Sequence, residues 1–84
     1  MLQRSVHFKK QFNKLPHKIQ EKVSDRINLL IEDEFNLILH NHKLHGEYDQ
    51  YRSINITGDL RLLYKKVDTV TYLAFIGSHS ELYQ

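Results

Sequence analysis

Residues suited to acid–base chemistry are concentrated in the second half of the chain. His42 lies in the segment HKLHG, Asp59 follows a glycine in a turn, and His79 lies in GSHSEL near the C-terminus. Histidine is the usual proton donor or acceptor near neutral pH. Asp59 could orient or stabilise a histidine, or act as the base. Arg61, in LRLLY, offers a guanidinium that stabilises charge on a phosphate. On residue types alone, such a set suits general acid–base chemistry beside a stabilised negative charge.

Each of these residues also has a structural interpretation. His79 could complete a C-terminal turn, Asp59 could belong to a β-turn, and His42 could simply lie in a loop. The functional interpretation of His42 is a base or a phosphate ligand. Arg52 and Arg61 lie nine residues apart across a predicted turn. We expect them to face one another on the open side of a sheet, with Arg52 serving structure or RNA binding. The alternative is two arginines with packed aliphatic stems and solvated heads.

The three histidines His40, His42 and His45 indicate a metal site only weakly. The chain has no cysteine and offers no clear fourth ligand beside them. We therefore predict neither a metal nor another cofactor. The lack of cysteine excludes disulfides and fits a reducing compartment.

Three successive predicted strands must position these side chains. Residues 48–56, 60–66 and 70–76 are rich in β-branched and aromatic residues. Their short connections require an antiparallel meander, because parallel pairing needs long crossovers. We expect Gly58 to supply a positive φ in the first turn and Gly46 to allow a sharp entry into the sheet. The five tyrosines are expected in the core or at its rim: Tyr48, Tyr51, Tyr64, Tyr72 and Tyr83.

The first half of the chain has the pattern of an edge strand followed by two helices. Residues 2–7 alternate weakly, and residues 8–15 carry a helical apolar stripe. Pro16 ends that helix and begins a second one, which runs to about Glu34. Residues 35–44 are expected to be irregular. The predicted fold class is α+β, in the order β-α-α-β-β-β, with a helical hairpin on one face of a four-stranded, mainly antiparallel sheet and the other face open.

Length and composition indicate one folded domain, residues 1–84, with 40% hydrophobic and 26% charged residues. No apolar run approaches the roughly 20 residues of a membrane helix, and the N-terminus lacks the apolar core of a signal peptide. We therefore expect a cytoplasmic protein without membrane contact. Residues 1–26 carry seven basic and two acidic side chains, whereas residues 27–50 carry one and five. The basic part favours a polyanionic partner, with Lys9 and Lys10 as candidate RNA contacts, or else simply a solvated face.

The chain resembles the RelE/ParE superfamily of bacterial toxins, in particular its YafQ-like branch of ribosome-dependent mRNA endonucleases. The resemblance is carried by four segments in order along the chain: HKLHG, YR, LRLLY and GSHSEL. The resemblance covers essentially the whole chain, and its specific motifs lie in the second half. It implies the same order of strands and helices. It also implies a toxin of a type II toxin–antitoxin module that cleaves mRNA on the ribosome and is neutralised by a cognate antitoxin.

By position, the resemblance implies catalytic roles for His42, Asp59 and His79. The YafQ-like branch has a further histidine four residues before the aspartate, where this chain has Asn55. An amide can hydrogen-bond a phosphate oxygen or a base but cannot titrate, so we expect Asn55 to bind RNA. Arg61 stands where other nucleases of the superfamily have an arginine facing the RNA, and we expect it to support catalysis.

Two other functions stay open. One is a ParE-like toxin that poisons DNA gyrase, although that branch is not built around a set such as His42, Asp59 and His79. The other is a binding module of the same fold with weakened catalysis, because Asn55 replaces a titratable residue. Three results distinguish these functions. Ribosome-dependent mRNA cuts favour the endoribonuclease, gyrase-linked DNA breaks favour the ParE-like toxin, and the absence of both favours the binding module.

Overall fold

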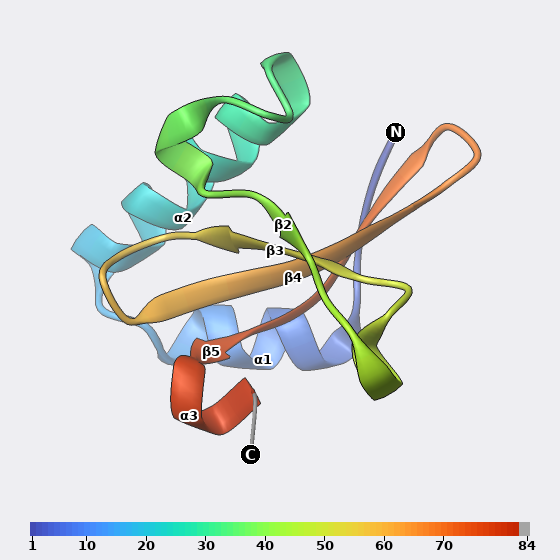
Figure 1. Cartoon of the computed structure of the whole chain (residues 1–84). Helices are drawn as coiled ribbons and strands as arrows, with labels where there is room; N and C mark the ends of the chain where they lie inside the picture. The colour runs from blue at the N-terminus through green and yellow to red at the C-terminus, as the bar shows by residue number, and fades with distance from the viewer. Residues whose placement is uncertain (83–84) are drawn as a thin grey trace.

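A computed structural model describes residues 1–82 and shows a five-stranded sheet in the order β1-β5-β4-β3-β2 (Figure 1). Tyr83 lies outside the described residues. The strands are β1 Leu2–Arg4, β2 His42–Lys43, β3 Arg52–Asn55, β4 Leu60–Val67 and β5 Val70–Ser78. The helices are α1 Val6–Lys14, α2 His17–Glu32 and α3 His79–Leu82, with 3₁₀ turns η1 Leu37–Leu39 and η2 Gly46–Tyr48. β1 pairs with β5 in parallel, and every other neighbouring pair is antiparallel.

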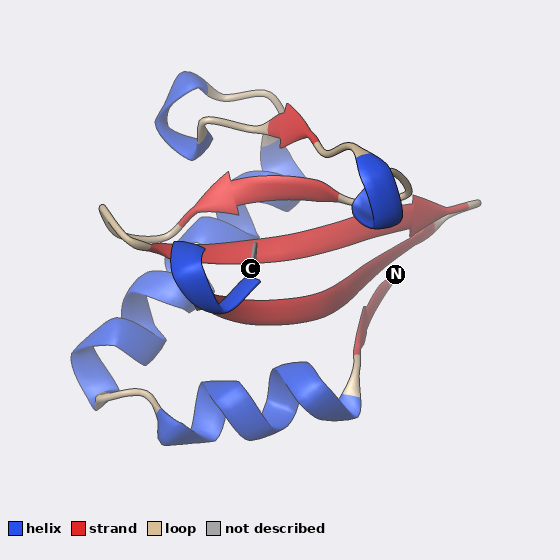
Figure 2. Ribbon diagram, turned by 60° about the horizontal axis from the view of Figure 1, so that its bottom comes forward, coloured by secondary structure: helices blue, strands red, loops and turns tan. Residues whose placement is uncertain are grey.

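The hairpin of α1 and α2 covers one face of the sheet (Figure 2). Ser5 caps α1 by accepting a 2.9 Å hydrogen bond from the Phe8 N–H. The Ser5 hydroxyl also donates to the Ala74 carbonyl in β5, so the start of α1 is attached to the sheet. Pro16 is the N-cap of α2, so it stands one residue before the first turn in which we expected it.

The two faces of the sheet bury different clusters. On the helix side, apolar residues of α1, α2 and η1 pack on Ile54, Leu62 and Tyr64. On the opposite side, Leu63 packs in a smaller cluster with residues of η2, β5 and α3 and with the residue after β2, and its buried members include Leu44 and Leu82. The alternation along β4 separates the two sets, since successive side chains of a strand point to opposite faces. The expectation that the second face is open was therefore only partly right.

Several predicted boundaries need correction. The sheet has five strands rather than four, because His42 and Lys43 pair with Ser53 and Arg52. The strand expected from residue 48 begins only at Arg52, since the preceding residues form the 3₁₀ turn η2. In the structure, β1 ends at Arg4, and β5 extends to Ser78 and runs directly into α3.

The turn chemistry also differs from the prediction in one place. Gly46 has a positive φ of 69°, as its sharp turn requires, but Gly58 does not adopt one. The Thr57 hydroxyl stabilises that turn instead, because it accepts from the Leu60 N–H at 3.0 Å. In the β4–β5 turn the positive φ falls on Asp68, at 57°, a conformation that aspartate tolerates better than most residues.

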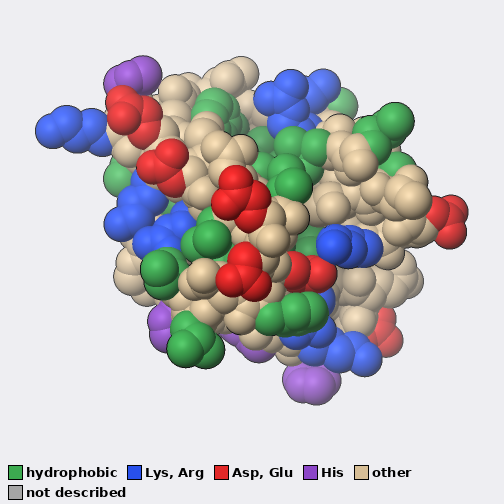
Figure 3. Space-filling view, turned by 90° about the horizontal axis from the view of Figure 1, so that it is seen from above, with side chains coloured by type: hydrophobic (Ala, Val, Ile, Leu, Met, Phe, Trp, Pro, Cys, Tyr) green, Lys and Arg blue, Asp and Glu red, His purple; other side chains and the backbone are tan. Residues whose placement is uncertain are grey.

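The molecular surface above the end of α2 is both acidic and apolar. Figure 3 shows acidic side chains interspersed with hydrophobic ones on this side. Four large hydrophobic residues of α2 and the segment after it are exposed: Ile31, Phe35, Leu37 and Ile38. No helix within residues 1–82 is long and apolar enough to cross a membrane.

Candidate active site

An open cavity of about 560 Å³ lies on the side of the sheet away from α1 and α2. Six described residues line it: His42, Lys43, Leu44, His45, Arg61 and His79. They come from β2 and the residues after it, from β4, and from the first position of α3. The structure thus brings together three of the four residues that we expected to be catalytic. Lys43 was not singled out, and His45 was considered only as a metal ligand, although both belong to the HKLHG segment.

Arg61 is held in place by four groups. Its Nε donates to the buried Ser53 hydroxyl at 2.6 Å, and one terminal nitrogen donates to Asn55 Oδ1. The other terminal nitrogen lies 3.5 Å from the His40 carbonyl and 3.3 Å from His42 Nδ1. A guanidinium fixed on several sides loses little further entropy when it binds an anion. Arg61 therefore presents a positive charge of defined orientation to the cavity.

His42 has two alternative partners for one ring nitrogen. Its Nδ1 lies 3.0 Å from the His40 carbonyl and 3.3 Å from Arg61. A protonated Nδ1 donates to the carbonyl, which leaves Nε2 of the neutral ring able to accept a proton. An unprotonated Nδ1 accepts from Arg61 instead. His40 adopts a left-handed backbone conformation, with φ and ψ both 47°, which directs its carbonyl to this position.

His79 begins a short helix rather than a loop, which corrects the expected setting of this residue. Its backbone N–H donates to the Asp59 carbonyl at 3.2 Å, so the start of α3 is joined to the β3–β4 turn. The Asp59 side chain is exposed, and Asp59 is not among the described residues that line the cavity. This backbone hydrogen bond places Asp59 next to His79.

The turn from β5 into α3 depends on close packing at Gly77. Gly77 pairs with Arg61 across β4 and β5, and a Cβ there would lie 3.3 Å from Glu81 Oε1. Glu81 in turn accepts from the Ser78 N–H at 2.8 Å. This hydrogen bond lowers the pKa of the Glu81 carboxyl below its ordinary value. The glycine therefore allows α3 to fold over the strand end and to place His79 at the cavity.

Arg52 does not face Arg61, so the expected phosphate-binding pair of arginines was wrong. In the β3–β4 register Arg52 pairs with Tyr64, and Asn55 pairs with Arg61. Tyr64 and Arg61 are an odd number of residues apart, which places them, and hence the two arginines, on opposite faces. Arg52 Nε donates to Asn41 Oδ1 at 2.8 Å, and its guanidinium lies 5.2 Å from the Phe35 ring centre.

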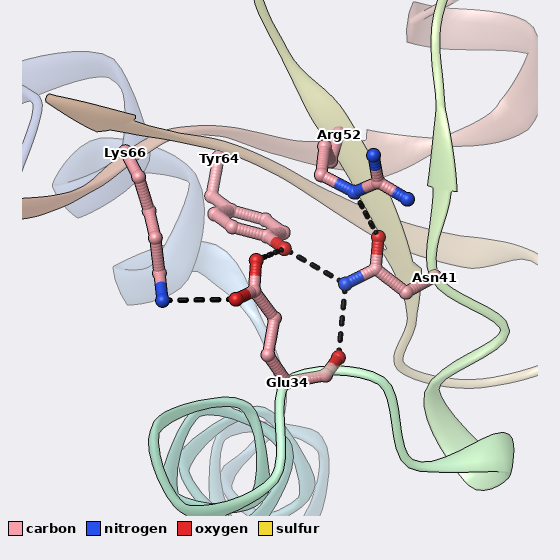
Figure 4. Close-up of polar contacts among 5 residues, drawn as sticks. All are labelled: Glu34, Asn41, Arg52, Tyr64 and Lys66. Carbon is pink, nitrogen blue, oxygen red and sulfur yellow. Dashed lines mark hydrogen bonds and ion pairs between the residues drawn. The ribbon is translucent and has the colours of Figure 1, made fainter.

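Arg52 instead belongs to a polar network on the helix side of the sheet (Figure 4). The Asn41 amide nitrogen donates to the Glu34 carbonyl at 3.0 Å and to the Tyr64 hydroxyl at 2.7 Å. Tyr64 donates to the Glu34 carboxylate at 2.6 Å, and Lys66 contacts the same carboxylate at 2.9 Å. Both donors of the Asn41 amide and its acceptor are therefore used.

The network changes the acidity of its two titratable members. Burial raises the pKa of the Tyr64 phenol, and its hydrogen bond to Glu34 raises it further. For Glu34, burial opposes ionisation, but the hydrogen bonds from Tyr64 and Lys66 outweigh it and lower the pKa of the carboxyl. At neutral pH, Glu34 is therefore charged and Tyr64 is neutral and donating.

Asn41 was missed by the sequence analysis, although it directly precedes His42. Its three partners lie 7, 11 and 23 residues away in the chain. Because such partners appear in no local pattern, nothing in the sequence marks the residue. In the structure Asn41 fixes the segment that carries both the His40 carbonyl and the His42 ring.

The remaining predicted residues lie away from the cavity. Lys9 and Lys10 are exposed on α1, which covers the opposite face of the sheet. Within residues 1–82, no group of three or more histidine, cysteine, aspartate or glutamate residues is placed to hold a metal ion.

Comparison with known proteins gives the family. The profile of a family described as the bacterial toxin of type II toxin–antitoxin system, YafQ, matches residues 1–84. This chain belongs to the YafQ family. Its α+β, RelE-like fold is confirmed by YafQ from E. coli strain BL21(DE3), which is 25% identical with a TM-score of 0.82 over 100% of this chain and 98% of that one.

Two solved complexes are similar as well. YafQ in the E. coli DinJ–YafQ complex is 25% identical, with a TM-score of 0.81 over 100% of this chain and 98% of that one. The YoeB–YefM complex from Staphylococcus aureus matches at 18% identity and a TM-score of 0.80, covering 94% and 95% of the two chains, which shows a shared fold alone. No curated protein sequence matches the chain. The YafQ-family chain is thus a toxin of a type II toxin–antitoxin system.

Proposed function

We propose that this YafQ-family toxin is a ribosome-dependent endoribonuclease that cleaves mRNA in the cavity lined by His42, Arg61 and His79. The observation that carries the proposal is the convergence of these three side chains, from β2, β4 and α3, on one cavity. Two imidazoles and a guanidinium supply the base, the acid and the positive charge that cleavage by a 2′-OH requires.

The proposed reaction proceeds by attack of the RNA on itself. His42 Nε2, in the tautomer that donates Nδ1–H to the His40 carbonyl, accepts the 2′-OH proton. The 2′-oxygen bonds to phosphorus while the bond from phosphorus to the 5′-oxygen breaks. Protonated His79 gives its proton to that 5′-oxygen, and Arg61 stabilises the negative charge on the phosphate oxygens. The products are a 2′,3′-cyclic phosphate and a 5′-hydroxyl.

The other candidate residues have supporting roles in this proposal. Asn55 orients Arg61 through its Oδ1. Asp59 positions His79 through the backbone hydrogen bond between them. Lys9 and Lys10 contact ribosomal RNA rather than the mRNA, because α1 covers the opposite face of the sheet. Arg52 has a structural role, because its guanidinium belongs to the network of Asn41 on the other face of the sheet.

The proposed partners are the ribosome with its mRNA and a cognate antitoxin, all in the cytoplasm. The antitoxin is supported by the solved DinJ–YafQ and YoeB–YefM complexes of similar fold. A nuclease that cuts mRNA harms its own host, so its activity requires an inhibitor.

In vitro translation followed by primer extension on the mRNA tests the proposal. Cuts that appear only when ribosomes are translating the message are the expected result. DNA breaks that require gyrase, without mRNA cuts, would instead indicate the ParE-like function. If neither mRNA cuts nor DNA breaks appear, the protein is a binding module with weakened catalysis, the interpretation that Asn55 suggested.

A further inference from the structure

A second cavity, of about 360 Å³, adjoins the candidate active site. It is formed by α2, the residue after η1 and the β3–β4 turn, which lies beside α2 in Figure 1. Its lining includes two cations of α2 together with polar groups of the other segments: Lys22, Arg26, His40, Asn55 and Thr57.

The two cavities meet at a boundary made of Asn55, His40 and Arg61. Asn55 lines the second cavity, and its side chain accepts a hydrogen bond from Arg61, which lines the first. His40 also lines the second cavity, and its carbonyl lies 3.5 Å from the same guanidinium. A chain molecule bound at Arg61 can therefore continue into the second cavity.

The second cavity carries uncompensated positive charge. Lys22 and Arg26 are four residues apart on α2 and so lie on one face of the helix, where like charges repel. Within residues 1–82 neither forms a salt bridge with a carboxylate. The neighbouring acids Glu21 and Asp25 line a different cavity, next to α1. An anion bound between Lys22 and Arg26 would remove their repulsion.

Arg26 is partly buried, and one terminal nitrogen of its guanidinium lies 3.5 Å from the Ile38 carbonyl. It is thus held at the wall of the cavity rather than extended into solvent. Asn55 and Thr57 add side chains that can hydrogen-bond a phosphate oxygen. The site has the cations and polar groups for a singly charged phosphodiester.

We infer that Lys22 and Arg26 form a second phosphate site, which binds the mRNA backbone phosphate next to the scissile one. The inference rests on the proposed function, since it assigns the scissile phosphate to Arg61. Contacts of this kind position the strand without reading its sequence. The mRNA is the source of the phosphate because Asn55, which lines this cavity, is hydrogen-bonded to Arg61 in the cavity where the mRNA would react.

The test combines a protein variant with a neutral mRNA linkage. Ribosomes are programmed with messages that carry a single methylphosphonate, which lacks the negative charge, at each linkage beside the cut in turn. Single-turnover cleavage is measured for wild type, for the double variant Lys22→Gln/Arg26→Gln, and for Lys9→Gln/Lys10→Gln. The last removes the same charge from α1 and is the matched control.

At one linkage, the methylphosphonate should lower wild-type cleavage by about tenfold, the order expected for losing a charged hydrogen bond. On the unmodified message, the Lys22→Gln/Arg26→Gln variant should cleave about as slowly as wild type does on the methylphosphonate message. A methylphosphonate at that linkage should not slow this variant any further. The Lys9→Gln/Lys10→Gln control loses proposed contacts to ribosomal RNA, so its overall rate can fall on every message. Its rate on the methylphosphonate message should still be lowered by the same factor as that of wild type. Circular dichroism and urea unfolding verify that both variants are folded.

Undiminished sensitivity of the Lys22→Gln/Arg26→Gln variant would overturn the inference. If that variant were slow on every message yet fully sensitive, the bound phosphate would belong to ribosomal RNA. Normal wild-type cleavage with no sensitive linkage would refute the second site alone. Absence of any wild-type cleavage would refute the proposed function and the site with it.

Discussion

The polar groups on the two faces of the sheet lie in opposite environments: one set is buried in a hydrogen-bonded network, and the other lines an open cavity. On β4, Tyr64 is fully buried on the helix side, and its hydroxyl closes a network with Glu34 and Asn41. Three residues earlier on the same strand, Arg61 lies on the other face and contacts His42 at the edge of an open cavity. One strand thus contributes to both stability and chemistry, because its alternation sends neighbouring residues to different environments.

Substitutions on the two faces should therefore have different effects, on stability on the helix side and on activity at the cavity. Groups in the closed network have used their hydrogen-bonding capacity, so removing one leaves a buried partner unsatisfied and costs free energy of unfolding. Groups at the cavity are partly solvated, so their removal should spare stability and lower activity. Asn41 belongs to the network but adjoins His42, and it should affect both properties.

The largest effect is expected for His79→Ala. Loss of a general acid typically lowers the rate by about 10²–10⁴-fold, and His79 is exposed at the start of α3. We expect mRNA cleavage on ribosomes to fall by that order with an unchanged urea midpoint. His17→Ala, which removes an exposed histidine of α2 that contacts Glu21, is the control. Near-normal cleavage by His79→Ala would remove this residue from the mechanism.

Arg61→Ala should lower single-turnover cleavage by about 10²-fold, the order seen when one donor to a developing oxyanion is lost. Arg61→Lys should restore only part of the rate, because an ammonium cannot reproduce the guanidinium fork that contacts Ser53 and Asn55. If Arg61→Ala instead unfolds the domain, Arg61 contributes to stability. The assignment of stability to the helix side and activity to the open face would then be wrong.

Asn41→Ala should lower both stability and the rate of cleavage. It leaves Arg52 Nε and the Glu34 carbonyl without their partner, which should cost about 1–3 kcal/mol of unfolding free energy. It should also slow cleavage, because His42 loses its fixed position. The distinguishing readout is the pH–rate profile of cleavage, which should change in shape. Arg52→Gln, which weakens the same network without adjoining His42, should lower stability and leave the profile unchanged. A slow Asn41→Ala with an unaltered profile would limit Asn41 to stability.

A smaller effect is expected from Glu34 in acid. Its folded-state pKa lies below the ordinary value of 4.5, so its stabilising contribution is complete above about pH 4.5 and is lost as pH falls through the folded-state pKa. Glu34→Gln should therefore lower stability at pH 7 and flatten its decline in acid. Glu32→Gln, at the exposed end of α2, should keep the wild-type decline. Equal acid profiles for wild type and Glu34→Gln would show that the network does not depend on this charge.

The smallest effect is expected for Asn55→His. This change introduces the titratable residue of the YafQ-like pattern but removes the Oδ1 that accepts from Arg61. We expect the cleavage rate to be unchanged or lower. Single-turnover pH–rate profiles of the two proteins compare them directly. A clear gain in rate with a new inflection near the reference histidine pKa of about 6.5 would show that Asn55 is a lost catalytic group rather than a positioning one.

Local patterns predicted the helical hairpin and the two long strands β4 and β5, because periodicity and composition determine such elements. They missed β2, a two-residue strand that exists through its pairing with Ser53 and Arg52. They also misplaced Arg52, since the face of a strand residue depends on register, and a shift of one residue reverses it.

The candidate site was predictable where a motif named its residues, and unpredictable where it depended on distant contacts. The resemblance pointed to His42, Asp59 and His79, and also to Arg61, whose chemistry suits the same role. Of these four, Asp59 is not among the described residues that line the cavity. The Asn41 network joins segments as far as 23 residues apart, and Lys22 and Arg26 reach the site only because α2 packs beside the β3–β4 turn.

The central claim is that the open-face cavity cleaves mRNA through the 2′-OH of the RNA. The most direct test is single-turnover cleavage by the wild-type toxin on ribosomes programmed with two messages, one all-ribose and one with a single 2′-deoxynucleotide immediately 5′ of the cut. We predict cleavage of the first, with a cyclic or 3′-phosphate end, and none of the second at that position. Equal cleavage of both messages, or a product with a 3′-hydroxyl end, would contradict the mechanism.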